Sequence, residues 1–215
     1  MSTGQSRLEL MIDVFEKRGQ RAMPLPTLMS SELVEAILQE FRELEYLGDS
    51  PAHYSLLKAA DETPLNDEEP LRNQLAKGSR LVLVENEVPL PAKTARPSDP
   101  IYLRDQASGK VYKLNWQPAI IGRPDKNQPH NDRVAVDLET YKTGLRVSRR
   151  HAQITEENGR YFIQSMSKNP TAIKRGDDEP IVVTEEKRPL QNGDIIHLVR
   201  SNITLKFIIR QGEAE

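Results

Sequence analysis

The apolar residues between positions 101 and 210 come in short runs, and this spacing limits the fold more than any other feature. Runs such as Ala119–Gly122 and Ile195–Val199 suit a strand and are too short for an ordinary helix. Turn signals separate the runs, and Asn158-Gly159 is the clearest because both residues tolerate a positive φ. Many short strands at regular spacing predict a β-sandwich. Strands are expected at residues 101–104, 110–114, 119–122, 133–138, 151–155, 160–166, 171–174, 181–184, 195–199 and 203–210.

A proline-rich stretch, Val88–Pro100, separates this half from the residues before it. Proline fixes φ and removes a hydrogen-bond donor, so the stretch is expected to be a semi-rigid linker. The two halves also differ in charge: residues 1–90 carry 9 Lys/Arg against 16 Asp/Glu, and residues 91–215 carry 21 against 16. We therefore expect two domains, at residues 1–88 and 100–212, joined by a linker at 89–99.

The first half mixes strands with one amphipathic helix. The helix is expected over Ser31–Leu47, where apolar residues recur at three- and four-residue spacing, with Ser30 or Ser31 as its cap. Extended segments are expected at residues 7–15, 21–29, 53–58 and 80–84, with a turn at Lys17–Gln20 around Gly19.

The order strand, strand, helix, strand, strand resembles a ubiquitin-like β-grasp domain, smaller than the sandwich and of α+β class, over about residues 6–88. The turn Lys77-Gly78-Ser79 leads into an apolar strand much as the last strand of ubiquitin is approached. The pattern is also similar to small ubiquitin-like proteins associated with bacterial type VII secretion. The last strand continues into ENEVPLPAKT and not into a Gly-Gly tail, so the likeness does not imply a protein modifier.

Four segments of the second half stand at the ends of predicted strands, where binding residues tend to lie. They are IIGRPDK (120–126), RVSRRHAQI (146–154), SMSKNPTAI (165–173) and PLQNGDIIHL (189–198). In order and spacing they resemble the signature of the forkhead-associated (FHA) domain over about residues 100–211. FHA domains are β-sandwiches that bind phosphothreonine on partner proteins, so the resemblance implies an all-β FHA-type β-sandwich with that role.

The residue types suit such a ligand. A phosphothreonine carries a charge of about −1.5 to −2 and three acceptor oxygens. Arg123 offers a planar cationic fork, Ser148 a hydroxyl donor, Arg149 a second cation, and the Asn169 amide can donate and accept at once. Each has a purely structural reading when taken alone, and their joint occurrence on one fold favours binding. The resemblance implies that the first three contact phosphate and that Asn169 holds the peptide main chain.

The resemblance also assigns supporting roles. Lys168 is expected to face the peptide, His151 to fasten the binding loop without touching the ligand, and Gly122 to allow a close approach of strand and loop. The family usually has Asn-Gly where this chain has Asn169-Pro170, and proline forbids the positive φ that glycine permits. The loop must therefore take another shape. The long Pro124–Arg133 insert could shape selectivity, and His130 within it is expected to be an exposed loop residue.

Other classes of function find no support. The chain has no cysteine, and no HExxH or EF-hand spacing, so no catalytic site, metal site or cofactor is expected and the protein is not expected to be an enzyme. The acidic clusters Asp61-Glu62 and Asp67–Glu69 read as solvated surface. The basic excess is too small to favour nucleic acid, no run can span a bilayer, and no secretion signal is evident, so a cytoplasmic location is expected.

Two functional hypotheses remain. The first is an adaptor that recruits a Thr-phosphorylated protein, which implies a Ser/Thr kinase in the same cell. The second is a phosphate-independent structural or assembly protein, such as a component of a secretion system, that uses the sandwich and β-grasp surfaces as a scaffold. A third idea is self-binding, in which phosphorylated Thr94 in the linker, or Thr63, folds back onto Arg123 and Arg149.

Overall fold

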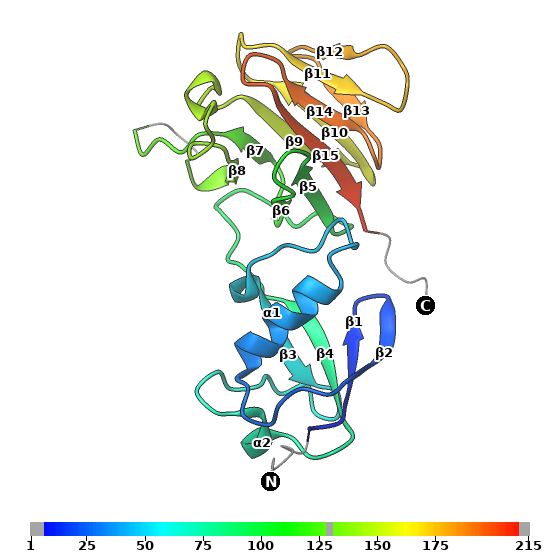
Figure 1. Ribbon diagram of the computed structural model, residues 1–215. Coiled ribbons are helices and arrows are strands. Elements are labelled where there is room, and N and C mark those ends of the chain that lie inside the picture. Colours follow the sequence, from blue (N-terminus) through cyan, green and yellow to red (C-terminus); the bar gives the residue numbers. More distant parts are fainter. Residues whose placement is uncertain (1–6, 128–130, 211–215) are drawn as a thin grey trace. The chain divides into compact units, whose positions relative to one another are not determined.

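A computed structural model describes residues 7–127 and 131–210, so His130 and residues 211–212 of the predicted sandwich lie outside the described residues. The chain divides into two compact units, Met1–Glu87 and Val88–Glu215 (Figure 1). The domain limits expected at residues 88, 100 and 212 stay predictions.

The first unit is a four-stranded sheet with one main helix. β1 and β4 pair in parallel at the centre, and β2 and β3 pair antiparallel at the two edges, giving the order β2-β1-β4-β3. The elements are β1 Leu10–Val14, β2 Lys17–Ala22, α1 Ser30–Glu40, η1 Pro51–His53, β3 Tyr54–Lys58, α2 Leu71–Gln74 and β4 Ser79–Glu85. The expected order of four strands and a helix is present, with α2 added before β4, but the second strand spans Lys17–Ala22 and its predicted range of 21–29 is wrong. The ubiquitin-like relationship stays a prediction.

The first hairpin turns earlier than the glycine suggested. β2 already begins at Lys17, so the turn predicted at Lys17–Gln20 is wrong and the chain reverses at Phe15-Glu16. Phe15 adopts a φ of 53°, and its ring packs edge-on against Tyr46, with centroids 5.7 Å apart. Gly19, at φ 63°, lies within β2 next to an irregularity in the β1–β2 register, and its N–H donates to Asp13 Oδ1 at 2.7 Å. The glycine therefore serves a bulge and the aromatic packing holds the turn.

Helix α1 ends at Glu40, seven residues before the predicted Leu47. Separate turns follow, in which Leu44 N–H donates to Phe41 O and Leu47 N–H to Leu44 O, and both leucines remain buried. The apolar spacing continued past the helix because these turns also face the core. The prediction that Ser30 or Ser31 caps the start of the helix is wrong. Glu32 accepts the Met29 N–H there, and Asp67 accepts the Ser31 N–H.

The second unit is a sandwich of two sheets, as the sequence predicts (Figure 1). One sheet has the order β13-β10-β9-β7-β8 and the other β12-β11-β14-β15-β5-β6. The strands are β5 Ile101–Asp105, β6 Val111–Lys113, β7 Ala119–Gly122, β8 Val134–Asp137, β9 Ala152–Glu157, β10 Arg160–Ser165, β11 Thr171–Lys174, β12 Ile181–Val183, β13 Arg188–Leu190, β14 Ile195–Leu198 and β15 Ile203–Ile209. Two 3₁₀ turns, η2 Asn131–Arg133 and η3 Gly144–Arg146, lie in the loops around β8.

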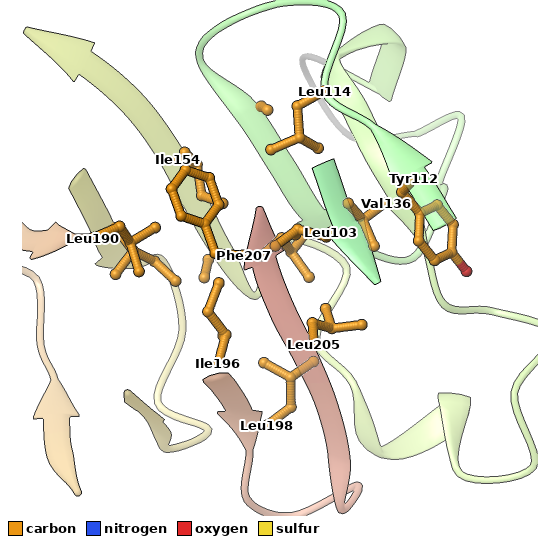
Figure 2. Close-up of a cluster of buried hydrophobic side chains, with 14 of the residues drawn as sticks. Leu103, Tyr112, Leu114, Val136, Ile154, Leu190, Ile196, Leu198, Leu205 and Phe207 are labelled. Atoms are coloured by element: carbon orange, nitrogen blue, oxygen red, sulfur yellow. The ribbon is translucent and has the colours of Figure 1, made fainter. Parts of the chain in front are cut away.

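The core of this unit lies between the two sheets. Figure 2 shows Ile154 of β9 and Leu190 of β13 gathered with Ile196, Leu205 and Phe207 of the opposite sheet. All five are 5% exposed or less. Alternate residues of each strand enter this layer, which is the period-2 pattern of a strand with one face in the core.

Strand pairing brings several loops to one edge of the sandwich. Ile121 near the end of β7 pairs with Ala152 at the start of β9, which also pairs with Ser165 at the end of β10. In the other sheet Thr171, which begins β11, pairs with Leu198, which ends β14. The loop that begins at Arg123 and the loops 143–151, 166–170 and 199–202 therefore meet their strands at the same edge, which we call the rim.

Part of the expected linker, which belongs to the second unit, is hydrogen-bonded to the sandwich. Ala95 and Gln117 exchange backbone hydrogen bonds of 3.0 and 2.8 Å, the Ser98 N–H donates to Glu156 at 2.8 Å, and Arg133 donates to Ala92 O at 3.0 Å. The bridge places Thr94 beside Gln117, whereas Arg123 follows the opposite end of β7. Six residues of extended chain span about 20 Å, so a phosphate on Thr94 could reach Arg123 only if this bridge opened.

Candidate functional site

Arg123 directly follows β7, and two hydrogen bonds fix it at the rim. Its backbone N–H donates to Arg149 O at 3.2 Å, and its side-chain Nε donates to Val147 O at 2.7 Å. The terminal Nη1 and Nη2 atoms make no hydrogen bond or ion pair with any residue in the described ranges. The guanidinium is thus anchored through Nε, and its two-pronged end is available to an anion.

The buried side chain of His151 holds the backbone of Ser148 in place. The Ser148 N–H donates to His151 Nδ1 at 3.2 Å, and His151 Nε2 lies 3.1 Å from Thr171 Oγ1. Because Nδ1 accepts a hydrogen bond, the neutral ring carries its proton on Nε2 and donates it to Thr171. His151 is 1% exposed, and burial lowers its pKa to about 4. A neutral imidazole therefore joins the loop before β9 to the start of β11 at ordinary pH.

The side chain of Asn169 joins three parts of the rim. Its Nδ2 donates to Ser148 Oγ at 2.9 Å and to Arg146 O at 3.2 Å, and its Oδ1 accepts from Arg200 Nη1 at 2.7 Å. Both amide protons are in use, whereas Oδ1 has a second lone pair left. Ser148 Oγ accepts here, so its own proton remains for another acceptor. Asn169 can accept a ligand N–H at once, but donating to a ligand carbonyl requires exchange of an internal bond.

Gly122 is where strand and loop come closest. A Cβ at this position would lie 2.2 Å from Arg149 O and 3.0 Å from Ser148 O. These are backbone atoms of the loop that carries Ser148 and Arg149, so any side chain would push the loop away from Arg123. The close approach is the one expected from the sequence.

Arg149 and Lys168, which the resemblance places at the ligand, differ from each other in their partners. Arg149 is ion-paired, with its Nε 2.6 Å from Asp125 Oδ2 in the loop after β7. Lys168 is exposed and has no hydrogen bond or ion pair within the part of the chain that the structure describes. The structure therefore joins Ser148, Asn169 and His151 into one hydrogen-bonded group, attaches Arg123 to the same loop through Val147 O and Arg149 O, and leaves Lys168 exposed.

Two cations that the sequence analysis did not single out complete the rim. A pocket of about 400 Å³ is lined by Leu145, Arg146, Asn169 and Arg200. Neither arginine has an acidic partner within residues 7–127 and 131–210. Arg146 stands inside the RVSRRHAQI segment and could have been found there, but Arg200 reaches Asn169 only because β14 pairs with β11, which the sequence does not show.

The match to a known family covers most of this unit. Residues 119–199 match the family model of the FHA domain. This segment is an FHA domain. The match begins with β7 and reaches just beyond β14, so β5, β6 and β15 complete the second sheet of the FHA fold from outside it. The FHA match includes every candidate residue named above except Arg200.

Solved structures similar to the chain include FHA domains. An FHA domain solved in a study of phosphothreonine-dependent FHA interactions is 22% identical. The match covers 52% of this chain and 98% of that chain, with a TM-score of 0.38. Mycobacterium tuberculosis EmbR, in complex with a low-affinity phosphopeptide, is 25% identical. The match covers 54% of this chain and 26% of EmbR, with a TM-score of 0.38. A designed protein based on ubiquitin is 19% identical, with 41% and 100% covered and a TM-score of 0.31. No curated protein matches the chain.

None of the helices within the described residues has the length and hydropathy needed to cross a membrane.

Proposed function

We propose that the protein is an adaptor whose FHA domain binds a phosphothreonine-containing segment of a partner protein. The observation that carries the proposal is the hydrogen bond from Asn169 to Ser148, with Arg123 anchored to the carbonyls of Val147 and Arg149 on either side of Ser148. This arrangement at the rim of an FHA domain leaves donor atoms for an anion. In this proposal the protein acts as a binding module and not as an enzyme, because the named donors would hold the phosphate without breaking a bond.

The phosphate would lie at the start of the 148–151 loop, on its solvent-exposed side. Arg123 would give it Nη1 and Nη2, Ser148 its hydroxyl proton, and Arg149 a further charge. Hydrogen bonds between charged groups are about twice as strong as neutral ones, so these contacts would supply most of the affinity.

The main chain next to the phosphothreonine would lie along Asn169 and Lys168. Asn169 Oδ1 would accept a peptide N–H while it keeps Arg200, and Lys168 would add a cation at the edge of the site. His151 and Gly122 would act from beneath, by setting the shape of the loop. The adaptor role implies a Ser/Thr kinase that phosphorylates the partner, a cytoplasmic location, and a first unit that supplies a second contact or a scaffold.

Fluorescence anisotropy with a degenerate phosphothreonine peptide library tests the proposal. The variants are Arg123→Ala and, as a matched control, Arg160→Ala, which removes an arginine at the far end of the β9–β10 hairpin from Ala152 and Ser165. We expect the library to bind, and its phosphoserine and unphosphorylated versions to bind much less. Arg123→Ala should weaken binding by at least about tenfold, and Arg160→Ala should leave it unchanged.

Equal binding of the three libraries, or equal loss in the two arginine variants, would contradict the proposal. A folded protein that binds none of the libraries would favour the assembly-protein hypothesis instead.

A further inference from the structure

The two arginines expected to hold phosphate are in different electrostatic states. Arg123 is anchored by a neutral carbonyl, whereas Arg149 is anchored by the carboxylate of Asp125 at 2.6 Å. The Asp125 side chain is 15% exposed and the Arg149 side chain 58% exposed. One of the two arginines expected to contact phosphate is thus already compensated from within the chain.

Asp125 is fixed in place by its own loop. Its backbone N–H donates to Asn131 Oδ1 at 2.6 Å, and its Oδ1 accepts the Asn127 N–H at 3.0 Å. Only Oδ2 faces Arg149. The carboxylate is therefore part of the loop structure, and the more exposed arginine is the member of the pair that has room to change its rotamer.

We propose that Asp125 is a built-in counter-anion that lowers the affinity of the FHA domain for phosphothreonine. This inference rests on the proposed function. If Arg149 leaves Asp125 to meet the phosphate, the ligand must break an ion pair; if Arg149 stays, the phosphate dianion lies near a fixed carboxylate. In both cases the net positive charge that faces the phosphate is one unit smaller than the charge of Arg123 and Arg149 without Asp125.

The opposing effect is smaller. Asp125 also restricts the rotamers of Arg149 and could present the guanidinium to the ligand. An exposed arginine held by one carboxylate oxygen keeps much of its freedom, so this gain does not offset the loss of a full charge next to a dianion. Because affinity differences at one interface lie mostly in the dissociation rate, the expected consequence is faster release of the phosphorylated partner.

The test compares the wild-type chain and Asp125→Asn in their binding of one phosphothreonine peptide. The peptide is chosen from the degenerate library. Asparagine keeps the size of the side chain and an oxygen that can accept the Asn127 N–H. Asp132→Asn is the matched control, since Asp132 is an exposed acid of the same loop without an ion pair to a described residue. At low ionic strength we expect Asp125→Asn to bind about two- to fivefold more tightly, with a slower dissociation rate, and the gain to shrink as salt is added. Asp132→Asn should change much less.

A double-mutant cycle with Arg149→Gln separates this role from a purely structural one. Loss of Arg149 should weaken binding more in the Asp125→Asn background than in the wild type, because the arginine is uncompensated there. Thermal unfolding monitors the fold of each variant.

The outcomes separate the two proposals. Unchanged or weaker binding by a folded Asp125→Asn variant, with wild-type binding that Arg123→Ala abolishes, overturns the role of Asp125 and leaves the proposed function standing. Binding by Asp125→Asn alone supports both. Absence of binding in both proteins overturns both.

Discussion

Acid should destabilise the FHA domain through His151. The folded imidazole has a pKa of about 4 because it is buried, whereas an unfolded chain protonates it near the ordinary value of 6.5. The stabilisation is therefore complete above 6.5 and is lost as the pH falls from 6.5 towards 4, where only the unfolded state takes up the proton. The gap between the two pKa values corresponds to about 3 kcal/mol. That is a large share of the roughly 5–15 kcal/mol that stabilises a typical domain.

Urea unfolding over this pH range measures the effect. The single tryptophan, Trp116, lies in the second unit and donates its Nε1–H to Arg133 O at 3.2 Å, so its fluorescence follows that unit alone. The reference is His151→Asn, which cannot titrate but can still accept the Ser148 N–H. Carboxylates titrate in both proteins, so the difference between the two pH profiles isolates His151.

The wild type should lose about 3 kcal/mol more than His151→Asn between pH 6.5 and 4. Parallel profiles would refute the reasoning, because they would mean that His151 takes up its proton in the folded state as readily as in the unfolded one. Phosphopeptide binding should lose the support of this loop only at a pH of about 4 and below, where the folded ring itself takes up a proton and Nδ1 can no longer accept the Ser148 N–H.

Other predictions follow from the packing. Gly122→Ala should destabilise the second unit by about 1–3 kcal/mol in Trp116-monitored unfolding and weaken phosphopeptide binding, because the new methyl group would meet Arg149 O; an unchanged unfolding midpoint would contradict the close approach. Asp194→Asn should cost about 2–4 kcal/mol in the same assay, because Asp194 is 1% exposed and pairs with Arg175 through two bonds of 2.8 Å; a loss below 1 kcal/mol would show that the pair adds little. Asp13→Asn should lower the first unit's unfolding midpoint in circular dichroism and leave the Trp116 transition unchanged, because Asp13 joins Arg80 and Gly19 within that unit; a shifted Trp116 transition would argue against this.

The sandwich was predictable because its information is local. Strand runs and turn residues can be read along the chain, and segments such as RVSRRHAQI carry several binding residues at once. Predicted strands agree with β5 to β12, β14 and β15, and the short β13, which contains Pro189, was missed. The pairing of the strands then brings their loops to one edge of the sandwich. Residues far apart in the sequence become neighbours there, although their individual contacts were not predicted from the sequence.

The errors arose where tertiary contacts override local signals. Gly19 reads as a turn, but packing of Phe15 against Tyr46 and Tyr54 moves the reversal two residues earlier. Asp67 reads as solvated surface, but it accepts hydrogen bonds at the start of α1.

The candidate site shows the same division. Arg123, Ser148 and Asn169 could be predicted from their motifs, whereas the Asp125–Arg149 pair and the approach of Arg200 depend on where side chains settle after folding. The hydrogen bonds from residues 92–98 to the second unit likewise need the folded β7 and β9 as partners, so the proline content alone indicated only a linker.

The most direct test of the central claim is a ¹H–¹⁵N NMR titration of the full-length chain with a phosphothreonine peptide selected from the library. The account predicts that the largest shifts fall on the amides of Arg123, Ser148, Arg149 and Asn169, with the first unit and the Asn158-Gly159 hairpin unaffected. Absence of shifts in a folded protein, or shifts of equal size with the unphosphorylated peptide, would contradict it.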